Sequence, residues 1–369
     1  MATYEEIRSL AHKEPVIVDL PPVSSVYFTD YEIYSNVQSF EENLFDPDYL
    51  FESDVIIDST ERSPKYTNLE CDFNPLTSEL DSVIDWSSPD DHDQLRDSLQ
   101  IQSQIKNLVV EKSSAEVVVL LAVDGLSFET IQQVSDYWPL ETETLPVFAD
   151  GATTTSEGFR RLFYGTSIES VHSMMATRKG YLSHQGYLQW SQNESTEPTS
   201  AFTSMNERNI VRGESFDTIL KEIETEGSVT SKTYIQIVRD GLSRDTYPDV
   251  LDRNEAAKEL IDDTVRLQKL LETITETAQI FLTAGHGLLW QEHIEDTWRI
   301  IDDSETHHPR YIETQHDTEH GLTKRTAQGN TVTGLAKPFL TRPLQDDEVA
   351  VSGGFSYHES IIPFVEVSK

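Results

Sequence analysis

Three apolar runs stand out along an otherwise polar chain. Residues 117–123 read VVVLLAV, residues 233–241 read TYIQIVRDG and residues 278–284 read AQIFLTA. Continuous runs of aliphatic and β-branched residues at this length are typical of strands that are buried on both faces of a parallel sheet. We therefore expect a strand over each of the three ranges.

Helical patterns alternate with these strands. Residues 128–138 (FETIQQVSDYW) place apolar side chains at helical spacing, and residues 253–274 carry the pattern of an amphipathic helix. A strand, a turn and a helix in repeated succession predict an α/β domain with a mainly parallel sheet flanked by helices. No internal repeat is visible.

The first part of the chain has a different texture. Short apolar pieces at 14–28 and 53–59 are separated by acidic turns, and a polar helical pattern closes this part at 93–110. We expect an N-terminal α/β or α+β region over residues 1–112, to which the sequence assigns no role. The main domain is then expected over residues 113–369.

The charge of the chain is strongly unbalanced. Sixty-five Asp and Glu residues face 28 Lys and Arg residues, which gives a formal net charge of −37. A hydrophobic content of 37% argues against general disorder. The acidity predicts a halophilic protein, adapted to a salt-rich, haloarchaeal cytoplasm. The same charge disfavours nonspecific binding of nucleic acid at low salt, a repulsion that concentrated salt screens.

Several classes of protein are disfavoured by simple counts. Cys71 is the single cysteine, so neither an intrachain disulfide nor a thiolate metal cluster is expected. No apolar stretch approaches the roughly 20 residues of a membrane span. The first residues lack the basic head and apolar core of a secretory signal. We therefore expect a cytoplasmic protein without a membrane partner.

Ligand-type side chains follow the three expected strands directly. Asp124, Asp240 and His286 stand at the carboxyl ends of these strands, where α/β folds bind their ligands. Carboxylate and imidazole groups suit Mg²⁺, Mn²⁺ or Zn²⁺. Asp124 can also be read as a turn residue that caps the next helix. His286, held between two glycines, can be a metal ligand, a general base or part of a tight turn.

Hydroxyl side chains crowd the expected start of the helix that the apolar stretch FRRLFYG at 159–165 predicts. Thr154 followed by Glu157 fits a capping box. Thr155 and Ser156 then lie where free N–H groups and the helix dipole favour a phosphate or sulfate, and a hydroxyl placed there can attack phosphorus. Plain helix capping explains the same residues.

A polar stretch at 305–321 is rich in histidine. His307 and His308 offer nitrogen ligands for Zn²⁺ or Mn²⁺. Arg310 can bind a phosphate through two parallel hydrogen bonds. A solvated loop with exposed histidines is the alternative.

The order of these motifs resembles that of the alkaline phosphatase superfamily. The stretches VVLLAVDGLS, LPVFADGATTTSEGFRRLFYGTSIESVH, IFLTAGHG and GGFSYHESIIPF follow one another over residues 115–369. They look closest to the PglZ-type members of that superfamily, which belong to BREX phage-defence systems. The resemblance implies an alkaline-phosphatase-like fold and a metal-dependent phosphoesterase or phosphodiesterase that acts on a phosphorylated or nucleotide-type substrate. Other defence-system proteins are the partners it implies.

The resemblance also implies roles for individual residues. Asp124 matches the first metal-binding aspartate, Asp240 the aspartate of the second metal, and His286 the histidine of an Asp-His-Gly motif. Thr155 matches the nucleophile, because its interval to Gly165 at the helix end is preserved. Ser156 is a second hydroxyl beside it, available to the substrate.

Three positions depart from the pattern. Gly285 stands where the superfamily has the Asp of Asp-His-Gly, Ser352 where PglZ-like chains have His, and Arg244 where a histidine is expected. Two divalent ions need several charged or imidazole ligands to offset their repulsion. Histidines from 307–320, or His358, are the expected replacements.

Three hypotheses remain open at this point. The first is a phosphoesterase with a divergent metal site, and the second is an inactive scaffold subunit of a defence complex. The third is a metal-free hydrolase in which Thr155 or Ser156 attacks and His286 acts as the base.

Overall fold

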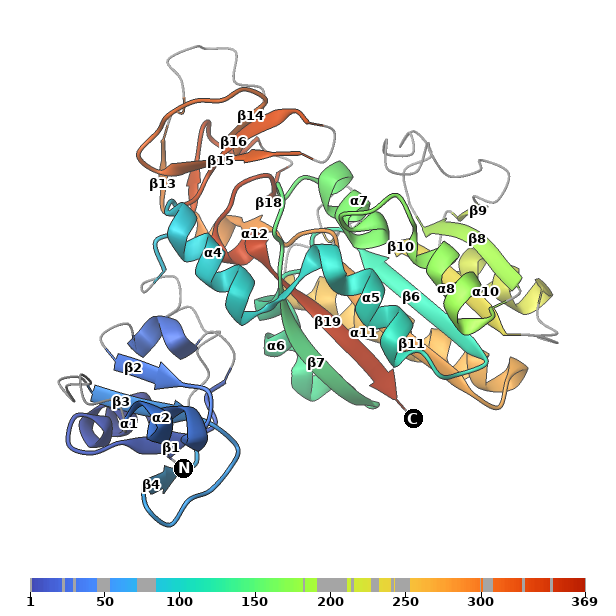
Figure 1. The fold of residues 1–369 in the computed structure, drawn as a ribbon. Coiled ribbons are helices and arrows are strands. Elements are labelled where there is room, and N and C mark those ends of the chain that lie inside the picture. The colour runs from blue at the N-terminus through green and yellow to red at the C-terminus, as the bar shows by residue number, and fades with distance from the viewer. Residues whose placement is uncertain are drawn as a thin grey trace. The chain divides into compact units, whose positions relative to one another are not determined.

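The computed structural model forms two compact units, which are coloured along the chain in Figure 1. The first contains residues 1–85 and 93–99, and the second contains residues 86–92 and 100–369. The structure describes residues 2–21, 24–28, 31–44, 54–71, 84–181, 183–190, 211–213, 216–226, 232–239, 242, 253–298, 300, 308–326, 329–345 and 348–368.

The first unit is a small α/β fold around a four-stranded parallel sheet. Val16 and Val18 face α1 on one side, while Ile17 between them packs with Phe40 of α2 on the other. This alternation gives each face of the sheet its own core. The strands in spatial order are β2 (Tyr31–Tyr34), β3 (Asp54–Asp58), β1 (Val16–Val18) and β4 (Thr67–Leu69), with α1 (Tyr4–Ala11), η1 (Ser24–Phe28) and α2 (Val37–Asn43).

The second unit is built on an eight-stranded sheet. Within the described residues β19 alone runs antiparallel, between β7 and β11, and the other neighbouring pairs are parallel. The prediction of an α/β fold with a mainly parallel sheet is confirmed. The strands in spatial order are β5 (Gln100–Ile101), β7 (Glu141–Phe148), β19 (Ile361–Ser368), β11 (Ala278–Ala284), β6 (Val117–Val123), β10 (Thr233–Arg239), β8 (Ser183–Trp190) and β9 (Val211–Gly213).

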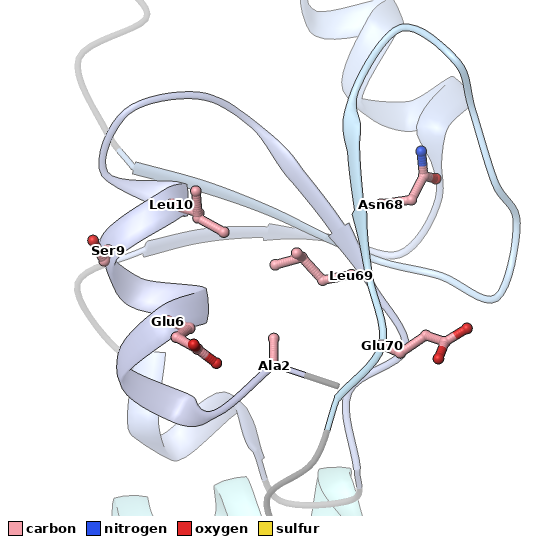
Figure 2. A pocket seen from close by; sticks show the side chains of 7 residues that line it. All are labelled: Ala2, Glu6, Ser9, Leu10, Asn68, Leu69 and Glu70. Atoms are coloured by element: carbon pink, nitrogen blue, oxygen red, sulfur yellow. The ribbon is translucent and has the colours of Figure 1, made fainter.

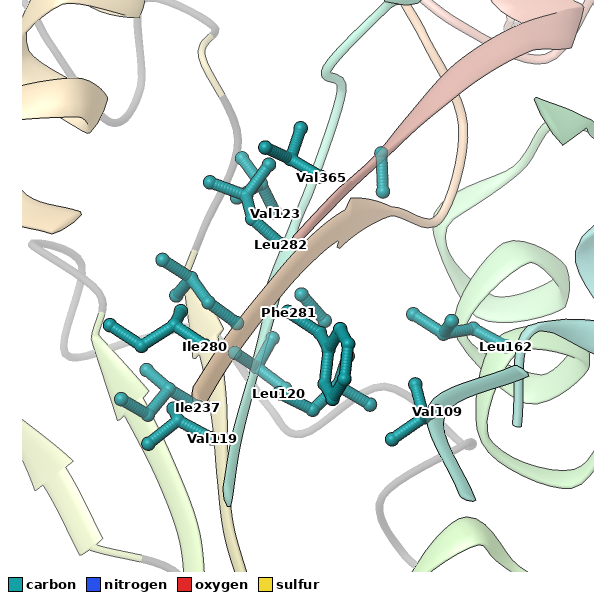
Figure 3. Packing of buried hydrophobic residues seen from close by; sticks show 14 of the residues in the cluster. Val109, Val119, Leu120, Val123, Leu162, Ile237, Ile280, Phe281, Leu282 and Val365 are labelled. Carbon is teal, nitrogen blue, oxygen red and sulfur yellow. The ribbon is translucent and has the colours of Figure 1, made fainter. Parts of the chain in front are cut away.

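Strand β6 lies at the centre of this sheet. All seven of its residues are buried, because β10 and β11 pair with its two edges and helices cover its faces. Figure 3 shows Leu120 and Phe281 of adjacent strands near Val109 and Leu162 from two helices. The helices of this unit are α5 (Ile105–Lys112), α6 (Phe128–Gln133), η3 (Ser135–Tyr137), α7 (Thr155–Tyr164), α8 (Val171–Lys179), α10 (Phe216–Glu226), α11 (Arg253–Ile274) and α12 (Tyr357–Ser360).

The pattern at 93–110 predicted one continuous helix. The structure instead divides this stretch among several short elements. Helix α4 (Pro89–Ser98) ends before β5, and η2 (Gln102–Gln104) leads into α5. Strand β5 pairs with β7, which interrupts the helical course. Because α5 buries its apolar side chains in the main core, the second unit begins before the expected boundary at residue 112.

The C-terminal third adds short strands beyond the main sheet. They form two two-stranded pairs and one three-stranded antiparallel sheet. Among the described residues no helix has the length and apolar character that a membrane span needs. The elements are β12 (Leu289–Trp290), η5 (Gln291–His293), β13 (Asp296–Thr297), β14 (Tyr311–Ile312), β15 (Gly321–Arg325), β16 (Thr331–Leu335), β17 (Phe339–Leu340) and β18 (Ala350–Val351).

Candidate active site

Two neighbouring strands deliver the first two side chains of the site. Strands β6 and β11 are parallel and in register, with Val123 opposite Ala284. Asp124 and His286, which follow these strands, therefore emerge at the same edge of the sheet.

Helix α7 brings the third side chain. It begins at Thr155 with Thr154 as N-cap. The predicted capping box is not formed: the Thr154 side chain makes no capping hydrogen bond, and Glu157 accepts from Arg161 Nε at 2.8 Å. The Thr155 hydroxyl therefore lies on the first residue of the helix.

Gly158 allows α7 to approach the strand end this closely, and Gly165 ends the helix. A Cβ on Gly158 would collide with the carbonyl oxygen of Gly285, so only glycine lets the helix backbone pack against the loop before His286. The same carbonyl accepts a hydrogen bond from Gln102 Nε2, a buried contact that the sequence did not reveal. Gly165 ends the helix with a φ of 59°, a conformation that favours glycine.

The three side chains converge around one point. Thr155 Oγ1 lies 3.2 Å from His286 Nε2 and 3.3 Å from both carboxylate oxygens of Asp124. His286 Nε2 lies 3.0 Å from Asp124 Oδ1. His286 is 1% exposed and the Asp124 side chain 23%, so the site is closed on the histidine side and accessible on the aspartate side.

The charges of the site favour a cation at this point. Burial lowers the pKa of His286, but the nearby Asp124 carboxylate, the Gly287 carbonyl and Glu359 together outweigh it and raise the pKa above its ordinary value. His286 Nδ1 is 2.8 Å from the Gly287 carbonyl and donates to it, which directs Nε2 toward Asp124 and Thr155. The carboxylate and Nε2 both present lone pairs, which repel one another unless a proton or a metal ion lies between them.

A relay of the Ser-His-Asp type does not fit this geometry. In such a relay the aspartate and the hydroxyl contact different ring nitrogens. Here Asp124 and Thr155 approach the same Nε2 of His286, while Gly287 occupies the other nitrogen. The arrangement favours ligands that share a cation over a metal-free general base.

One divalent ion fits the donor set. A carboxylate, an imidazole nitrogen and a hydroxyl within 3.3 Å of one another provide hard and borderline ligands for Zn²⁺, Mn²⁺ or Mg²⁺. Gly285 contributes no side chain, although a Cβ there would meet only ordinary contacts of 3.4–3.6 Å with Phe159 and Gly158. The missing carboxylate is therefore not excluded by packing.

Two expected ligands fall outside the described residues, namely Asp240 and His307; Arg244 does so as well. His308 is described and makes no hydrogen bond to Asp124, Thr155 or His286. Its Nδ1 accepts from the Arg310 backbone N–H at 3.3 Å, and its ring packs 4.0 Å from that of Tyr311. Burial lowers the pKa of His308 to about 4. These contacts give His308 a packing role.

Arg310 is not placed to bind a phosphate. Its side chain is fully buried and pairs with Glu359 through Nε and Nη2. The remaining N–H groups donate to the backbone carbonyls of Leu335, Lys337 and Phe339. The guanidinium is thus committed to the protein interior, because its donors already have partners.

Ser156 is exposed and lies at a small hollow beside the start of α7. The hollow has a volume of about 120 Å³ and is bordered also by Thr154, Arg160 and Tyr311. Arg160 has no hydrogen bond or ion pair with any described residue, whereas its neighbour Arg161 pairs with Asp150 and Glu157. Arg160 is thus a cation that borders this hollow together with Glu157 and Glu313, and the sequence pattern did not single it out.

A larger groove in the first unit has the opposite character. It lies between α1 and β4 and has a volume of about 560 Å³ (Figure 2). Glu6 and Glu70 line it, and none of its lining residues is a cation. A phosphorylated substrate is therefore better accommodated at α7.

Another group of ligand-type side chains lies in the second unit, formed by Glu129, His293 and His358. Their ligand atoms all lie within 4.8 Å of one another. The sequence offered His358 as a replacement ligand but gave no signal for the other two, which are far apart in the chain and separately unremarkable.

Solved structures similar to this chain include a nucleotide pyrophosphatase/phosphodiesterase, a phosphonoacetate hydrolase and a phosphoethanolamine transferase. Murine ectonucleotide pyrophosphatase/phosphodiesterase 5, an inactive form in complex with AMP, is 9% identical over 67% of this chain and 87% of that chain, with a TM-score of 0.40. Phosphonoacetate hydrolase from Sinorhizobium meliloti in complex with phosphonoacetate is 9% identical over 68% and 90%, with a TM-score of 0.45.

The C-terminal periplasmic domain of EptC from Escherichia coli, in complex with zinc, is 11% identical over 70% of this chain and 74% of that chain, with a TM-score of 0.34. No family model matches the chain. No curated protein matches it in sequence.

Proposed function

We propose that the chain is a metal-dependent phosphoesterase or phosphodiesterase with Thr155 as its nucleophile. The observation that carries this proposal is the convergence of Thr155, Asp124 and His286 within 3.0–3.3 Å at the carboxyl ends of β6 and β11. Asp124, His286 and Thr155 would hold one divalent ion. A bound ion would act as a Lewis acid and favour the alkoxide form of the hydroxyl.

The residues of the chain supply the remaining parts of the reaction. The Thr155 hydroxyl donates toward Asp124, so its proton has an acceptor as Oγ1 attacks phosphorus and the leaving alcohol departs. The N–H groups in the first turn of α7 would be available to the phosphoryl oxygens of a bound substrate. Arg160, which borders the adjacent hollow, would neutralise a phosphate or nucleotide substrate.

The resemblance at the level of motifs supports the finer part of the proposal. The order of strand, aspartate, nucleophile helix, His-Gly step and Gly-Gly segment resembles that of PglZ-like members of the alkaline phosphatase superfamily, with Gly285 in place of the Asp of their Asp-His-Gly motif. We infer a role in phage defence within the cytoplasm of a halophile, alongside other defence-system proteins. The divergent site distinguishes this chain from that pattern.

The test is hydrolysis of bis(p-nitrophenyl) phosphate and p-nitrophenyl phosphate in high salt with added Mn²⁺ or Zn²⁺. Thr155→Ala is expected to lower kcat at least about 100-fold, because the covalent step loses its nucleophile. Thr177→Ala, which removes an exposed hydroxyl from α8, is the control and retains the rate. Activity that is indifferent to Thr155→Ala and to a chelator would contradict the proposal.

The loss of expected metal ligands favours a second candidate function, that of an inactive scaffold subunit. Gly285 leaves Asp124 and His286 without the carboxylate of an Asp-His-Gly motif, and Ser352 replaces another expected ligand. An inactive scaffold subunit of a defence complex would show this erosion. It predicts wild-type protein without metal at the Thr155 site and without hydrolysis of either ester, together with stoichiometric co-purification of a partner.

A further inference from the structure

Three ligand-type side chains from distant parts of the chain meet beside the candidate active site. Glu129 lies in the first turn of α6, His293 ends η5, and His358 lies in α12. We refer to them as the Glu–His–His cluster. None of the three takes part in the chemistry proposed for Thr155.

The distances within the cluster resemble those of a metal site. His358 Nδ1 lies 2.9 Å from Glu129 Oε2, and His293 Nε2 lies 3.9 Å from the same oxygen. The two imidazole rings are stacked with centroids 3.9 Å apart. Tetrahedral zinc with bonds of about 2.1 Å spaces its ligand atoms about 3.4 Å apart, so small side-chain rotations complete the geometry.

Burial and charge leave the cluster ready to accept a cation. Burial raises the pKa of Glu129, but His358, Arg253 and His293 outweigh it and lower that pKa to about 2. Burial, with a smaller contribution from His358, lowers the pKa of His293 to about 4. Glu129 accepts from Arg253 and His358, and His293 Nε2 faces Arg253 as an acceptor, so both present the lone pairs that bind metal.

The guanidinium of Arg253 lies between Glu129 and His293, at the position where a metal ion would bind. Its Nη1 lies 3.1 Å from Glu129 Oε2 and 3.2 Å from His293 Nε2. A guanidinium only donates, so Nε2 of His293 carries its lone pair toward this point. Nη2 of Arg253 also contacts Gln133 and, at 3.1 Å, the largely exposed Glu292, which offers the guanidinium partners away from the cluster.

We propose that Glu129, His293 and His358 bind one divalent transition-metal ion of the zinc class. Binding moves the Arg253 guanidinium toward Glu292, its other carboxylate partner. This site shares no residue with the Asp124–Thr155–His286 site. Metal binding by the Glu–His–His cluster therefore does not depend on the proposed hydrolysis.

The metal would fix the loop that carries His286. The Gly287 N–H donates to the carbonyl of Glu359 at 2.9 Å, and a Cβ on Gly287 would collide with the carbonyl of His358. A bond from the metal to His358 therefore holds α12 against the residue that follows His286. The proposed role is structural, joining α6, η5 and α12.

The experiment is a Co²⁺ titration of the full chain carrying Asp124→Asn and His286→Gln, which removes the other candidate site. One Co²⁺ per chain with the intense visible bands of low-coordinate cobalt is expected. Adding His293→Gln or His358→Gln is expected to weaken binding more than about 100-fold. Removing the competing cation with Arg253→Gln is expected to tighten it, a direction that a folding defect would not produce.

Circular dichroism of each variant verifies that it is folded. Absence of Co²⁺ binding in the folded Asp124→Asn/His286→Gln chain would overturn the proposal. Unchanged binding after both His293→Gln and His358→Gln would overturn it as well. The same titration in wild type, compared with ester hydrolysis, separates this site from the Thr155 site, since each can be lost without the other.

Discussion

At position 285 the absence of a carboxylate is expected to weaken metal binding at the proposed Thr155 site. Gly285 precedes His286, and its backbone packs against Gly158 of α7. Its backbone does not require glycine, because φ is not positive and a Cβ would make only ordinary contacts. The site keeps one carboxylate where two would share the charge of the ion.

Gly285→Asp is expected to strengthen metal binding at this site by about 10-fold or more, because a second carboxylate joins Asp124 and His286. Isothermal titration with Mn²⁺ or Zn²⁺ measures the change. Gly285→Ala adds the same Cβ without the charge and serves as control. Equal affinities for the Asp and Ala variants would show that position 285 does not face the ion.

A buried histidine gives the protein an acid-sensitive stability. Burial, together with smaller effects of nearby charges, lowers the pKa of His308 to about 4. Between pH 6.5 and 4, His308 therefore binds a proton in the unfolded state, where its pKa is near 6.5, but remains neutral in the folded state. This contribution to stability is complete above about pH 6.5 and is lost as the pH falls toward 4.

The free energy of unfolding is accordingly expected to fall by up to about 3 kcal/mol between pH 6.5 and 4 because of His308. Urea unfolding at several pH values measures it, and His308→Gln flattens the profile. His316→Gln, at an exposed position, leaves the slope unchanged. A wild-type slope in the His308→Gln variant would refute the assignment.

At the scale of elements, a buried ion pair joins the short strands to α12. Arg310 precedes β14, Glu359 lies in α12, and both side chains are fully buried. Glu359 also accepts from Gly354 N–H at 2.8 Å and from Ser356 Oγ at 2.7 Å. Its carboxylate therefore organises the Gly-Gly segment as well as the pair.

Removing one charge of this pair leaves the other buried without compensation. Glu359→Gln is expected to lower the free energy of unfolding by about 3–5 kcal/mol. Urea unfolding provides the measurement. Glu348→Gln tests the same chemistry at the Arg342 pair, whose side chains are about a quarter exposed, and is expected to cost about 1 kcal/mol or less. Equal losses in the two variants would contradict the argument from burial.

For the molecule as a whole, the net charge of −37 is the dominant physical fact. Repulsion between the acidic side chains opposes the folded state more than the expanded one. Salt screens this repulsion, with a Debye length of about 10 Å at 0.1 M and about 3 Å at 1 M.

The midpoint of thermal unfolding is therefore expected to rise by several degrees between 0.1 M and 2 M KCl. Differential scanning calorimetry measures it. Sucrose at matched osmolality controls for general exclusion of solutes from the protein surface, which also stabilises folded states. Equal midpoints at low and high KCl would count against a halophilic protein.

The sequence by itself determined the elements with strong periodicity and the residues at their ends. The strands at 117–123 and 278–284 and the helix at 253–274 lie where the apolar pattern placed them, because complete burial leaves an unbroken apolar run. The strand expected at 233–241 is present as β10 over Thr233–Arg239. Asp124 and His286 could be singled out for the same reason: parallel strands end at one edge.

Only the tertiary structure decided which polar side chains meet. Arg310 and His308 carried the right chemistry for a site, yet packing turned one into a buried ion partner and the other into a partly buried histidine against Tyr311. Gln102, Glu129 and His293 became relevant through contacts across long stretches of chain. Such contacts depend on the three-dimensional course of the backbone, and no local pattern of residues encodes them.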